Sequence, residues 1–195
     1  TETNFSTIVD EALAAGPDAI AILSFTNQTP AIVRELAGKG WDMSKTYFVD
    51  GNLQNFGTDG DIGFPEGTLT DAQGTLPGSY PSEEFQKRML EVDPDLRDYS
   101  YGPESYDAVM LVALAALRGG ATDGQTIRDN MAAVSGADGG TPCTGWEECS
   151  ALLEDDEDIA YQSASGVGPF NDANDPSSAF IGIYQFGEDN TYSAY

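Results

Sequence analysis

One apolar run near the start of the chain constrains the fold more than any other feature. Residues Ala19 to Ser24 read AIAILS, without the alternation of polar and apolar positions that a half-exposed strand shows. Such a run is typical of a parallel strand covered on both faces. We therefore expect a buried strand here, in a sheet whose two faces are both packed.

Helical patterns lie on either side of this run. The Thr29-Pro30 pair marks one helix start, with threonine as the cap and proline in the first turn. Thr46 to Val49 form a second expected strand. The order helix, strand, helix, strand with short joints predicts an α/β fold with right-handed crossovers. The first helix ends at Gly16-Pro17, and its predicted buried face comprises Phe5, Ile8, Val9, Ala12 and Leu13.

The rest of the chain is predicted to be mainly helical. Residues 51 to 79 are rich in glycine, and we expect the chain to cross between two bodies there. The helix Glu104 to Leu117 is apolar all round and should therefore be covered all round. Further helices are expected at Ser82–Pro94, Asp123–Ser135 and Trp146–Leu153, and strands at Ala179–Phe186 and toward Tyr195.

The charge excludes several classes of function. The chain of 195 residues has 33 acidic and 8 basic residues and a formal charge of -25. Such a surface repels phosphate backbones and anionic lipids, so we expect no nucleic-acid partner. A salty or an extracellular setting would each account for the acidity. Histidine is absent, which excludes Ser-His-Asp and Cys-His catalysis and imidazole metal sites.

The two cysteines, Cys143 and Cys149, lie in the sequence CTGWEEC. They cannot form a structural zinc site by themselves, and their spacing is not C-x-x-C. We favour a local disulfide over two unrelated reduced thiols. A loop this short would stabilise the fold by about 2 kcal/mol in the chain-entropy model. The disulfide would indicate an oxidising compartment.

Candidate site residues follow from the rule that ligands of open α/β sheets bind beyond the carboxyl ends of the strands. The rule selects the segment after each of the first two strands. Phe25 offers an apolar wall and Asp50 a charge, while the neighbouring polar side chains offer hydrogen bonds. Alternatively, Phe25 is a core residue and Asp50 caps a turn before Gly51. The candidate residues are Ser24, Phe25, Thr26, Asn27, Gln28, Asp50 and Gly51.

Two other acidic stretches are interpreted structurally. Asn171 to Ser178 has oxygen ligands at alternate positions but lacks the glycine and glutamate of a calcium loop, so we interpret it as a turn. Leu153 to Ile159 is interpreted as a solvated helix end. We predict no metal, no cofactor and no catalytic residues.

Several segments, taken in order, resemble one known family. They are NFSTIVDEALAAGPDAIAIL, YFVDGN, ESYDAVMLVALAAL and the long stretch from CTGWEEC to FIGIYQF. The chain resembles the second half of the substrate-binding subunits of branched-chain amino-acid ABC transporters. The resemblance implies a Rossmann-like, parallel-sheet lobe of the type I periplasmic-binding-protein fold, within an incomplete two-lobe architecture.

This resemblance also implies a domain organisation. Residues 1–76 would be the α/β part of the second lobe and residues 77–178 the helical part of the first lobe. Residues 179–195 would return to the second lobe, with hinge crossings near Pro77 and Phe180. The chain would then be the C-terminal part of such a protein. The apolar helix Tyr106 to Leu117 would contact the missing N-terminal part or a second copy of the chain.

The function implied is binding of an amino-acid-like ligand between two lobes by hinge closure, with an ABC permease as partner. The resemblance assigns Asp50 to the ligand's α-ammonium. It also places Tyr101 and Glu104 near the hinge, as ligand contacts or hinge residues, whereas the residues themselves favour a capping or packing role. The implied location is extracytoplasmic, in the periplasm or as a cell-surface lipoprotein.

Two other functions remain open from the sequence. The same fold serves as a ligand-sensing domain of receptors and regulators. A metal-dependent hydrolase of the α/β class has only the acidic clusters in its favour.

Overall fold

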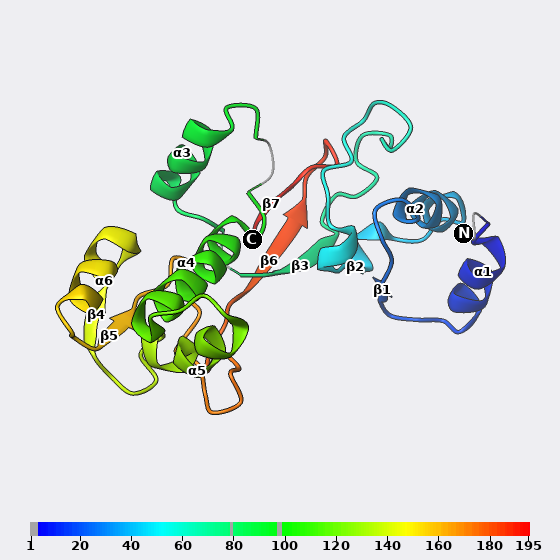
Figure 1. Cartoon of the computed structure of the whole chain (residues 1–195). Coiled ribbons are helices and arrows are strands. Elements are labelled where there is room, and N and C mark those ends of the chain that lie inside the picture. Colours follow the sequence, from blue (N-terminus) through cyan, green and yellow to red (C-terminus); the bar gives the residue numbers. More distant parts are fainter. Residues whose placement is uncertain (1–3, 79, 97–98) are drawn as a thin grey trace. The chain divides into compact units, whose positions relative to one another are not determined.

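The computed structural model describes residues 4–78, 80–96 and 99–195 (Figure 1). The chain forms two compact units, Thr1–Leu76 with Ile181–Tyr195, and Pro77–Phe180. It crosses between them at Leu76–Pro77 and again at Phe180–Ile181. Each unit has its own hydrophobic core.

The first unit is built on a five-stranded sheet with the order β1-β2-β3-β6-β7. The strands β1, β2 and β3 are parallel, with Ile22 opposite Phe48 and Phe48 opposite Gly74. The last strand, β7, is antiparallel to β6. The α/β class predicted from the sequence is therefore confirmed. The strands are β1 (Ile20–Ile22), β2 (Thr46–Phe48), β3 (Gln73–Pro77), β6 (Ile181–Phe186) and β7 (Tyr192–Ala194).

Two helices pack against one face of this sheet, called here the inner face, which carries the core residues Ile22, Phe48 and Phe186. They are α1 (Ser6–Ala14) and α2 (Thr29–Gly38), and both contribute to the same core as the strands. Helix α2 begins at Thr29, with Gln28 as its cap, so the predicted start is wrong by one residue. Ile8 was predicted to face inward from α1, but its side chain is 60% exposed.

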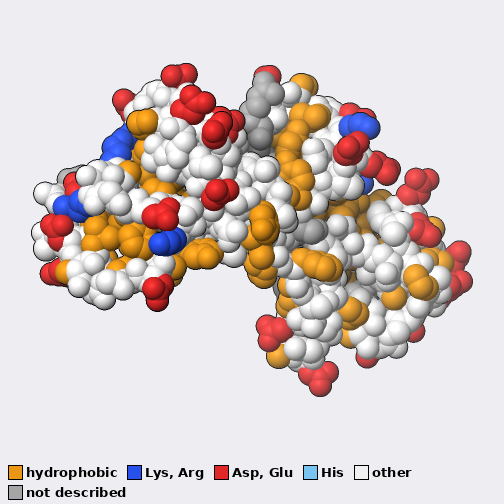
Figure 2. All heavy atoms as spheres, turned by 180° about the vertical axis from the view of Figure 1, so that it is seen from behind, with side chains coloured by type: hydrophobic (Ala, Val, Ile, Leu, Met, Phe, Trp, Pro, Cys, Tyr) orange, Lys and Arg blue, Asp and Glu red, His pale blue; other side chains and the backbone are white. Residues whose placement is uncertain are grey.

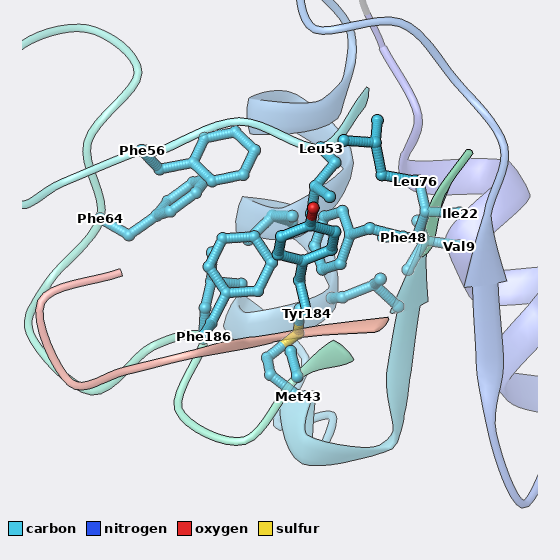
Figure 3. Packing of buried hydrophobic residues seen from close by; sticks show 14 residues of the cluster. Val9, Ile22, Met43, Phe48, Leu53, Phe56, Phe64, Leu76, Tyr184 and Phe186 are labelled. Atoms are coloured by element: carbon cyan, nitrogen blue, oxygen red, sulfur yellow. The ribbon is translucent and has the colours of Figure 1, made fainter. Parts of the chain in front are cut away.

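Aromatic rings fill the centre of this core (Figure 3). The rings of Phe48 and Phe186 are 5.1 Å apart between centroids, as are those of Phe56 and Phe64. Both pairs are tilted, which is a favourable geometry for aromatic contacts. The glycine-rich stretch after β2 therefore belongs to the first unit, because it supplies Phe56 and Phe64 to the core.

A single buried asparagine holds the loop after β2 against the β6–β7 turn. The Asn190 amide nitrogen lies 3.2, 3.0 and 3.1 Å from the carbonyl oxygens of Gly57, Phe64 and Pro65. Its side-chain oxygen accepts a 3.0 Å hydrogen bond from the Leu69 N–H. Asn190 has φ 57°, a left-handed conformation that asparagine tolerates better than most residues. One side chain thus fixes a long irregular segment.

The opposite face of the sheet is apolar and exposed. Leu23, which follows the buried Ile22, is 78% exposed, and Tyr47, which lies between two buried residues of β2, is 47% exposed. Ile183 in β6 is 49% exposed in the same way. The prediction of a first strand covered on both faces is therefore wrong for this chain. The reason is that α1 and α2 pack on the same inner core, which leaves the outer face uncovered by the described part of this unit.

The second unit is mainly helical. Its longest helix, α4, packs against α5 and α6 beside a two-stranded parallel sheet. Ser82 caps α3 and Asp123 caps α5, each through a side-chain oxygen that accepts backbone N–H bonds. Helices were predicted to begin at both residues. The elements are α3 (Glu83–Val92), α4 (Gly102–Gly119), α5 (Gly124–Val134), α6 (Gly145–Glu154), β4 (Thr141–Cys143) and β5 (Ile159–Tyr161).

Helix α4 is covered on one side only. Leu114 and Ala115 are fully buried in the core of the second unit. On the other side Val109 is 69% exposed and Val112 is 43% exposed. The expectation that this helix would be covered all round is therefore wrong for the chain as described.

The predicted disulfide is present. Cys143 and Cys149 are bonded, with their Cα atoms 5.3 Å apart. Both are buried in the core of the second unit, where they join the end of β4 to the middle of α6. The bond therefore closes a small ring around the start of α6.

Carboxylates are spread over the surface visible in Figure 2, whereas lysine and arginine side chains are few. Within residues 4–78, 80–96 and 99–195, no helix is long and apolar enough to cross a membrane. The same residues contain no cluster of three or more His, Cys, Asp or Glu side chains that could hold a metal ion.

Candidate ligand-binding site

The loops after β1 and β2 lie side by side at one edge of the first unit's sheet. The parallel register of Ile22 with Phe48 makes both loops leave the sheet at its carboxyl edge. A Cβ atom added to Gly51 would lie 3.3 Å from the Ser24 carbonyl oxygen and 3.6 Å from a ring carbon of Phe25. The two predicted segments are therefore in contact.

Asn52 connects the two strand ends through hydrogen bonds. Its amide nitrogen donates to the Ile22 carbonyl at 2.6 Å and lies 3.2 Å from the Ser24 hydroxyl. Its side-chain oxygen accepts a 2.9 Å hydrogen bond from the Val49 N–H. The side chain is 0% exposed, so water does not compete for these bonds. Asn52 is therefore the residue that fixes the relative positions of the two loops.

The Ser24 hydroxyl is mostly committed to the fold. It lies 2.7 Å from the Thr29 hydroxyl, which itself donates to the Phe25 carbonyl at 2.9 Å. Because the Thr29 proton goes to that carbonyl, Ser24 must donate toward Thr29 and accept from Asn52. Ser24 therefore has no proton left for a ligand and can contribute one further acceptor position.

Phe25 is 71% exposed, so the alternative of a core phenylalanine does not hold. Its ring lies over Gly51, where a larger side chain would meet the ring and the Ser24 carbonyl. The pair forms an apolar patch open to solvent at the end of the strands. An aliphatic ligand group could pack on this patch without displacing the core.

The other predicted residues of these loops surround the patch. Thr26, Asn27 and Asp50 are exposed, and Gln28 is partly buried. Asp50 is the first residue of a 3-10 turn, Asp50–Asn52. The Gln28 side-chain oxygen is buried without a hydrogen-bond partner among the described residues. The structure therefore brings together a carboxylate, amides, a hydroxyl and an aromatic ring on two adjacent loops.

Tyr101 and Glu104 belong to the other unit, at the start of α4. Tyr101 has φ 60°, which is strained for an aromatic residue and costs about 1–2 kcal/mol. Such strain persists only where the surroundings enforce it, and it is frequent at binding sites. Tyr101 is 39% exposed.

Glu104 packs against one of the segments that cross between the units. Its carboxylate contacts Gly78, whose N–H donates a 2.7 Å hydrogen bond to the Phe180 carbonyl. Gly78 has φ 96°, and a side chain there would collide with Glu104. Burial raises the pKa of the Glu104 carboxyl, one oxygen of which has no hydrogen-bond partner within the described part of the chain. These contacts support a packing role beside the crossing segments.

Sequence reasoning missed the role of Asn52, although the residue follows two predicted site residues. A short Asp-Gly-Asn sequence after a strand indicates a turn, and turns usually expose asparagine. Its burial comes from the Ile22 carbonyl, which lies thirty positions away in the sequence. No local pattern reports such a contact.

Comparisons with known proteins identify the fold. No protein-family model matches the chain, and no curated protein matches its sequence. Solved structures match over all or nearly all of its length. They include the leucine-binding protein LivK of Thermotoga maritima, with 16% identity and a TM-score of 0.66. They also include LivJ of Streptococcus pneumoniae with bound isoleucine (19%, 0.55) and an ABC transporter permease from the Pseudomonas fluorescens group (13%, 0.53).

The chain covers only part of these structures. It is covered completely by the LivK and LivJ matches but spans 48% and 49% of those proteins. LivK is a leucine-binding protein, and LivJ is the substrate-binding protein of a branched-chain amino-acid transporter. The resemblance predicted from the sequence is confirmed: the chain has the α/β fold of type I periplasmic binding proteins and spans about half of the proteins that share it.

Proposed function

We propose that this chain is part of an extracytoplasmic solute-binding protein of an ABC transporter, and that it provides one wall of a site for a small amino-acid-like solute. The observation that carries the proposal is the contact between the Phe25 and Gly51 loops, fixed by Asn52. It lies at the carboxyl edge of a parallel sheet, where ligands of such folds bind.

The chemistry of these loops suits a zwitterion with an apolar side chain. The Asp50 carboxylate would pair with the ligand's ammonium group, which is a strong, directional contact. The Phe25 ring would pack against the side chain, and Thr26, Asn27 and Gln28 would supply hydrogen bonds. The LivJ structure holds isoleucine, a solute of this kind. Removing one partner of an enclosed charge pair typically costs about 2–5 kcal/mol.

We further propose that binding involves hinge closure between two lobes. Residues 1–76 and 179–195 would form one lobe and residues 77–178 part of the other. The chain crosses between its units at only two places, which would act as the hinge. Tyr101 and Glu104 would lie on the opposite wall or beside the hinge. The closed form would be recognised by an ABC permease.

The uncovered side of α4 is proposed to contact the remaining N-terminal part of the protein or a second copy of the chain. A groove of about 600 Å³ lies along Val109 and Val112, and its lining is almost entirely apolar. Contiguous apolar surface of this kind marks an interaction site. Light scattering with mass spectrometry tests the second alternative, since a monodisperse monomer of the chain alone would exclude a second copy.

An extracytoplasmic location is proposed from the fold and from the buried disulfide. Disulfides persist in oxidising compartments and are rare in the reducing cytosol. The Cys143–Cys149 bond supports such a location for this chain.

Amide NMR tests the proposed site directly. L-leucine and L-isoleucine are titrated into the ¹⁵N-labelled chain, and we expect saturable shifts at Phe25 and Gly51. Asp50→Asn should weaken binding at least tenfold. Asp18→Asn is the matched control, because Asp18 is exposed and precedes β1 at the opposite end of the strand. Unchanged affinity in Asp50→Asn would show that the assignment is wrong.

A further inference from the structure

A cavity of about 770 Å³ lies within the second unit, apart from the residues of the proposed site. It opens to solvent and is lined by the middle of α3, the start of α4, the first turn of α6, the end of β5 and the segment after it. This volume is in the range of cavities that hold small molecules. Its lining includes Arg88, Tyr106, Trp146, Glu147, Tyr161 and Gln162.

Arg88 presents an oriented cation to this cavity. Its guanidinium carbon lies 5.2 Å from the centre of the Tyr106 ring and 5.5 Å from that of Phe85. The two rings are themselves 5.6 Å apart, edge to face, and so form one support for the guanidinium. No carboxylate lies within ion-pair distance of Arg88 among the described residues. In a chain with 33 acidic and 8 basic residues, that leaves a planar set of donors for an external anion.

Glu147 presents an anion to the same cavity. It is exposed in the first turn of α6, and no hydrogen bond or ion pair engages its carboxylate within the described part of the chain, although its backbone carbonyl accepts from the Ser150 hydroxyl at 3.4 Å. Its neighbour Glu148 is already engaged, since it accepts hydrogen bonds from the Thr144 N–H at 2.8 Å and hydroxyl at 3.0 Å. The cavity therefore carries a cation and an anion that do not pair with one another.

The cavity has a fixed floor and an apolar wall. The Tyr161 hydroxyl donates a 2.7 Å hydrogen bond to Asp107, which is only 2% exposed. Asp107 also accepts 2.8 Å hydrogen bonds from the N–H groups of Ala164 and Ser165. These bonds hold the segment after β5 in place. Trp146, 47% exposed, supplies an apolar surface beside the two charged groups.

We infer that this cavity is a second binding site, for a small zwitterion with an apolar side chain. The ligand's carboxylate binds the guanidinium of Arg88, its ammonium binds Glu147, and its side chain packs on Trp146. The inference goes beyond the proposed function, because it assigns binding to residues of the second unit alone. Site occupancy thus does not require the loops that carry Phe25 and Asp50.

Fluorine NMR separates the two sites. The chain is labelled with 5-fluorotryptophan and contains two tryptophans, Trp41 in the first unit and Trp146 in the second. The Trp41 indole N–H donates to the Thr46 hydroxyl at 3.0 Å, so its signal is an internal reference. With L-leucine as the probe, we expect the Trp146 signal to shift saturably and the Trp41 signal to stay in place. No saturable shift of Trp146 up to about 50 mM leucine, beyond the range of weak small-molecule sites, overturns the inference.

Charge variants with matched controls test the two contacts. Arg88→Gln and Glu147→Gln should each weaken leucine binding at Trp146 about threefold to fivefold, since both charged groups are exposed. Lys87→Gln and Glu154→Gln change the net charge equally on the same helices, outside the cavity lining, and should leave the affinity within about twofold. Equal weakening in variants and controls would indicate a general charge effect and contradict the site.

Ligand analogues test whether both charges are required. 4-Methylpentanoate lacks the ammonium group of leucine, and 3-methylbutylamine lacks the carboxylate. Each should bind at least about tenfold more weakly than leucine at Trp146. Binding of either analogue as tight as leucine would exclude the zwitterion. Repeating the titration with Asp50→Asn distinguishes the proposals, since that change should weaken the leucine dependence of the Phe25 and Gly51 shifts at least tenfold and leave the Trp146 shift unchanged.

Discussion

The hydroxyl of Tyr161 donates a 2.7 Å hydrogen bond to the buried carboxylate of Asp107. Burial raises the pKa of Tyr161, and the hydrogen bond to Asp107 raises it further, so the donor stays protonated at all ordinary pH values. The two residues join β5 to α4 and so connect the small sheet of the second unit to its longest helix.

Removing this pair should destabilise the second unit unequally. Asp107→Ala deletes an acceptor with three hydrogen bonds and should lower the free energy of unfolding by about 3–5 kcal/mol, since bonds to charged groups contribute about 1.5–3 kcal/mol each and do not add fully. Tyr161→Phe removes only one of the three bonds, so its loss of unfolding free energy should be about 1–2 kcal/mol smaller than that of Asp107→Ala. Urea unfolding followed by near-ultraviolet circular dichroism measures both. Equal losses would mean that the two N–H bonds contribute nothing.

Asn52 should control the geometry of the candidate site. Asn52→Asp replaces a donor amide by a carboxylate facing the Ile22 carbonyl, and we expect a loss of about 2–4 kcal/mol in stability. Amide exchange should rise at Ser24–Gln28 and Asp50–Gly51 before it rises in the sheet. The exposed neighbour Asn55 lies outside this pair of strand ends, so Asn55→Asp serves as the comparison. Uniform loss of protection across the unit would show that Asn52 does not act locally.

The backbone and the side chain of Asn190 contribute separately. Asn190→Gly keeps the left-handed turn and removes the side-chain hydrogen bonds, for which we expect a loss of about 2–4 kcal/mol. Asn190→Ala removes the same bonds and adds backbone strain, so it should be about 1–2 kcal/mol less stable than the glycine variant. Thermal unfolding of the two variants measures the difference. Identical melting temperatures would exclude a contribution from the backbone.

Salt should stabilise this chain strongly. A formal charge of -25 makes the folded state repel itself, and ions screen that repulsion. We expect the melting temperature to rise between 0.1 M and 2 M sodium chloride, even though exposed pairs such as Lys45–Asp42 weaken. Sucrose is the control, because it stabilises proteins without screening charge. A larger rise with sucrose than with salt would contradict the electrostatic explanation.

Glu104 gives one pH dependence with a definite sign. Burial raises its pKa in the folded state above the ordinary value of 4.5, so the folded chain holds the proton more tightly than the unfolded chain. Stability from this group therefore falls as the pH rises from the unfolded-state pKa through the folded-state pKa. Glu104→Gln should remove this loss, and its stability relative to the parent should be greater at pH 7 than at pH 4. A relative stability of Glu104→Gln that is equal at pH 4 and pH 7 would contradict this sign.

Local sequence patterns predicted the fold because they depend on near neighbours. The Asp123 start of α5 is set by side-chain bonds within one turn, and the Cys143–Cys149 bond spans six positions. The same holds for the strand ends that carry the candidate site, because parallel strands share a carboxyl edge.

The parts that the sequence did not predict depend on contacts between distant residues. Asn190 reaches back more than a hundred positions to Leu69, and Asp107 joins residues that follow it by more than fifty. The exposed outer face at Leu23 and Tyr47 was also missed. An apolar run does not reveal whether the chain itself supplies a cover for both faces.

That outer face has a consequence for handling the protein. β1 is the edge strand of the sheet formed by the described residues, and the exposed side chains of Leu23 and Tyr47 lie near this edge, so together they form a template for aggregation. Mutual repulsion between highly negative copies is what keeps such templates apart in dilute solution. Acidification neutralises the repulsion, so turbidity should develop on lowering the pH toward the isoelectric point before the fold itself melts.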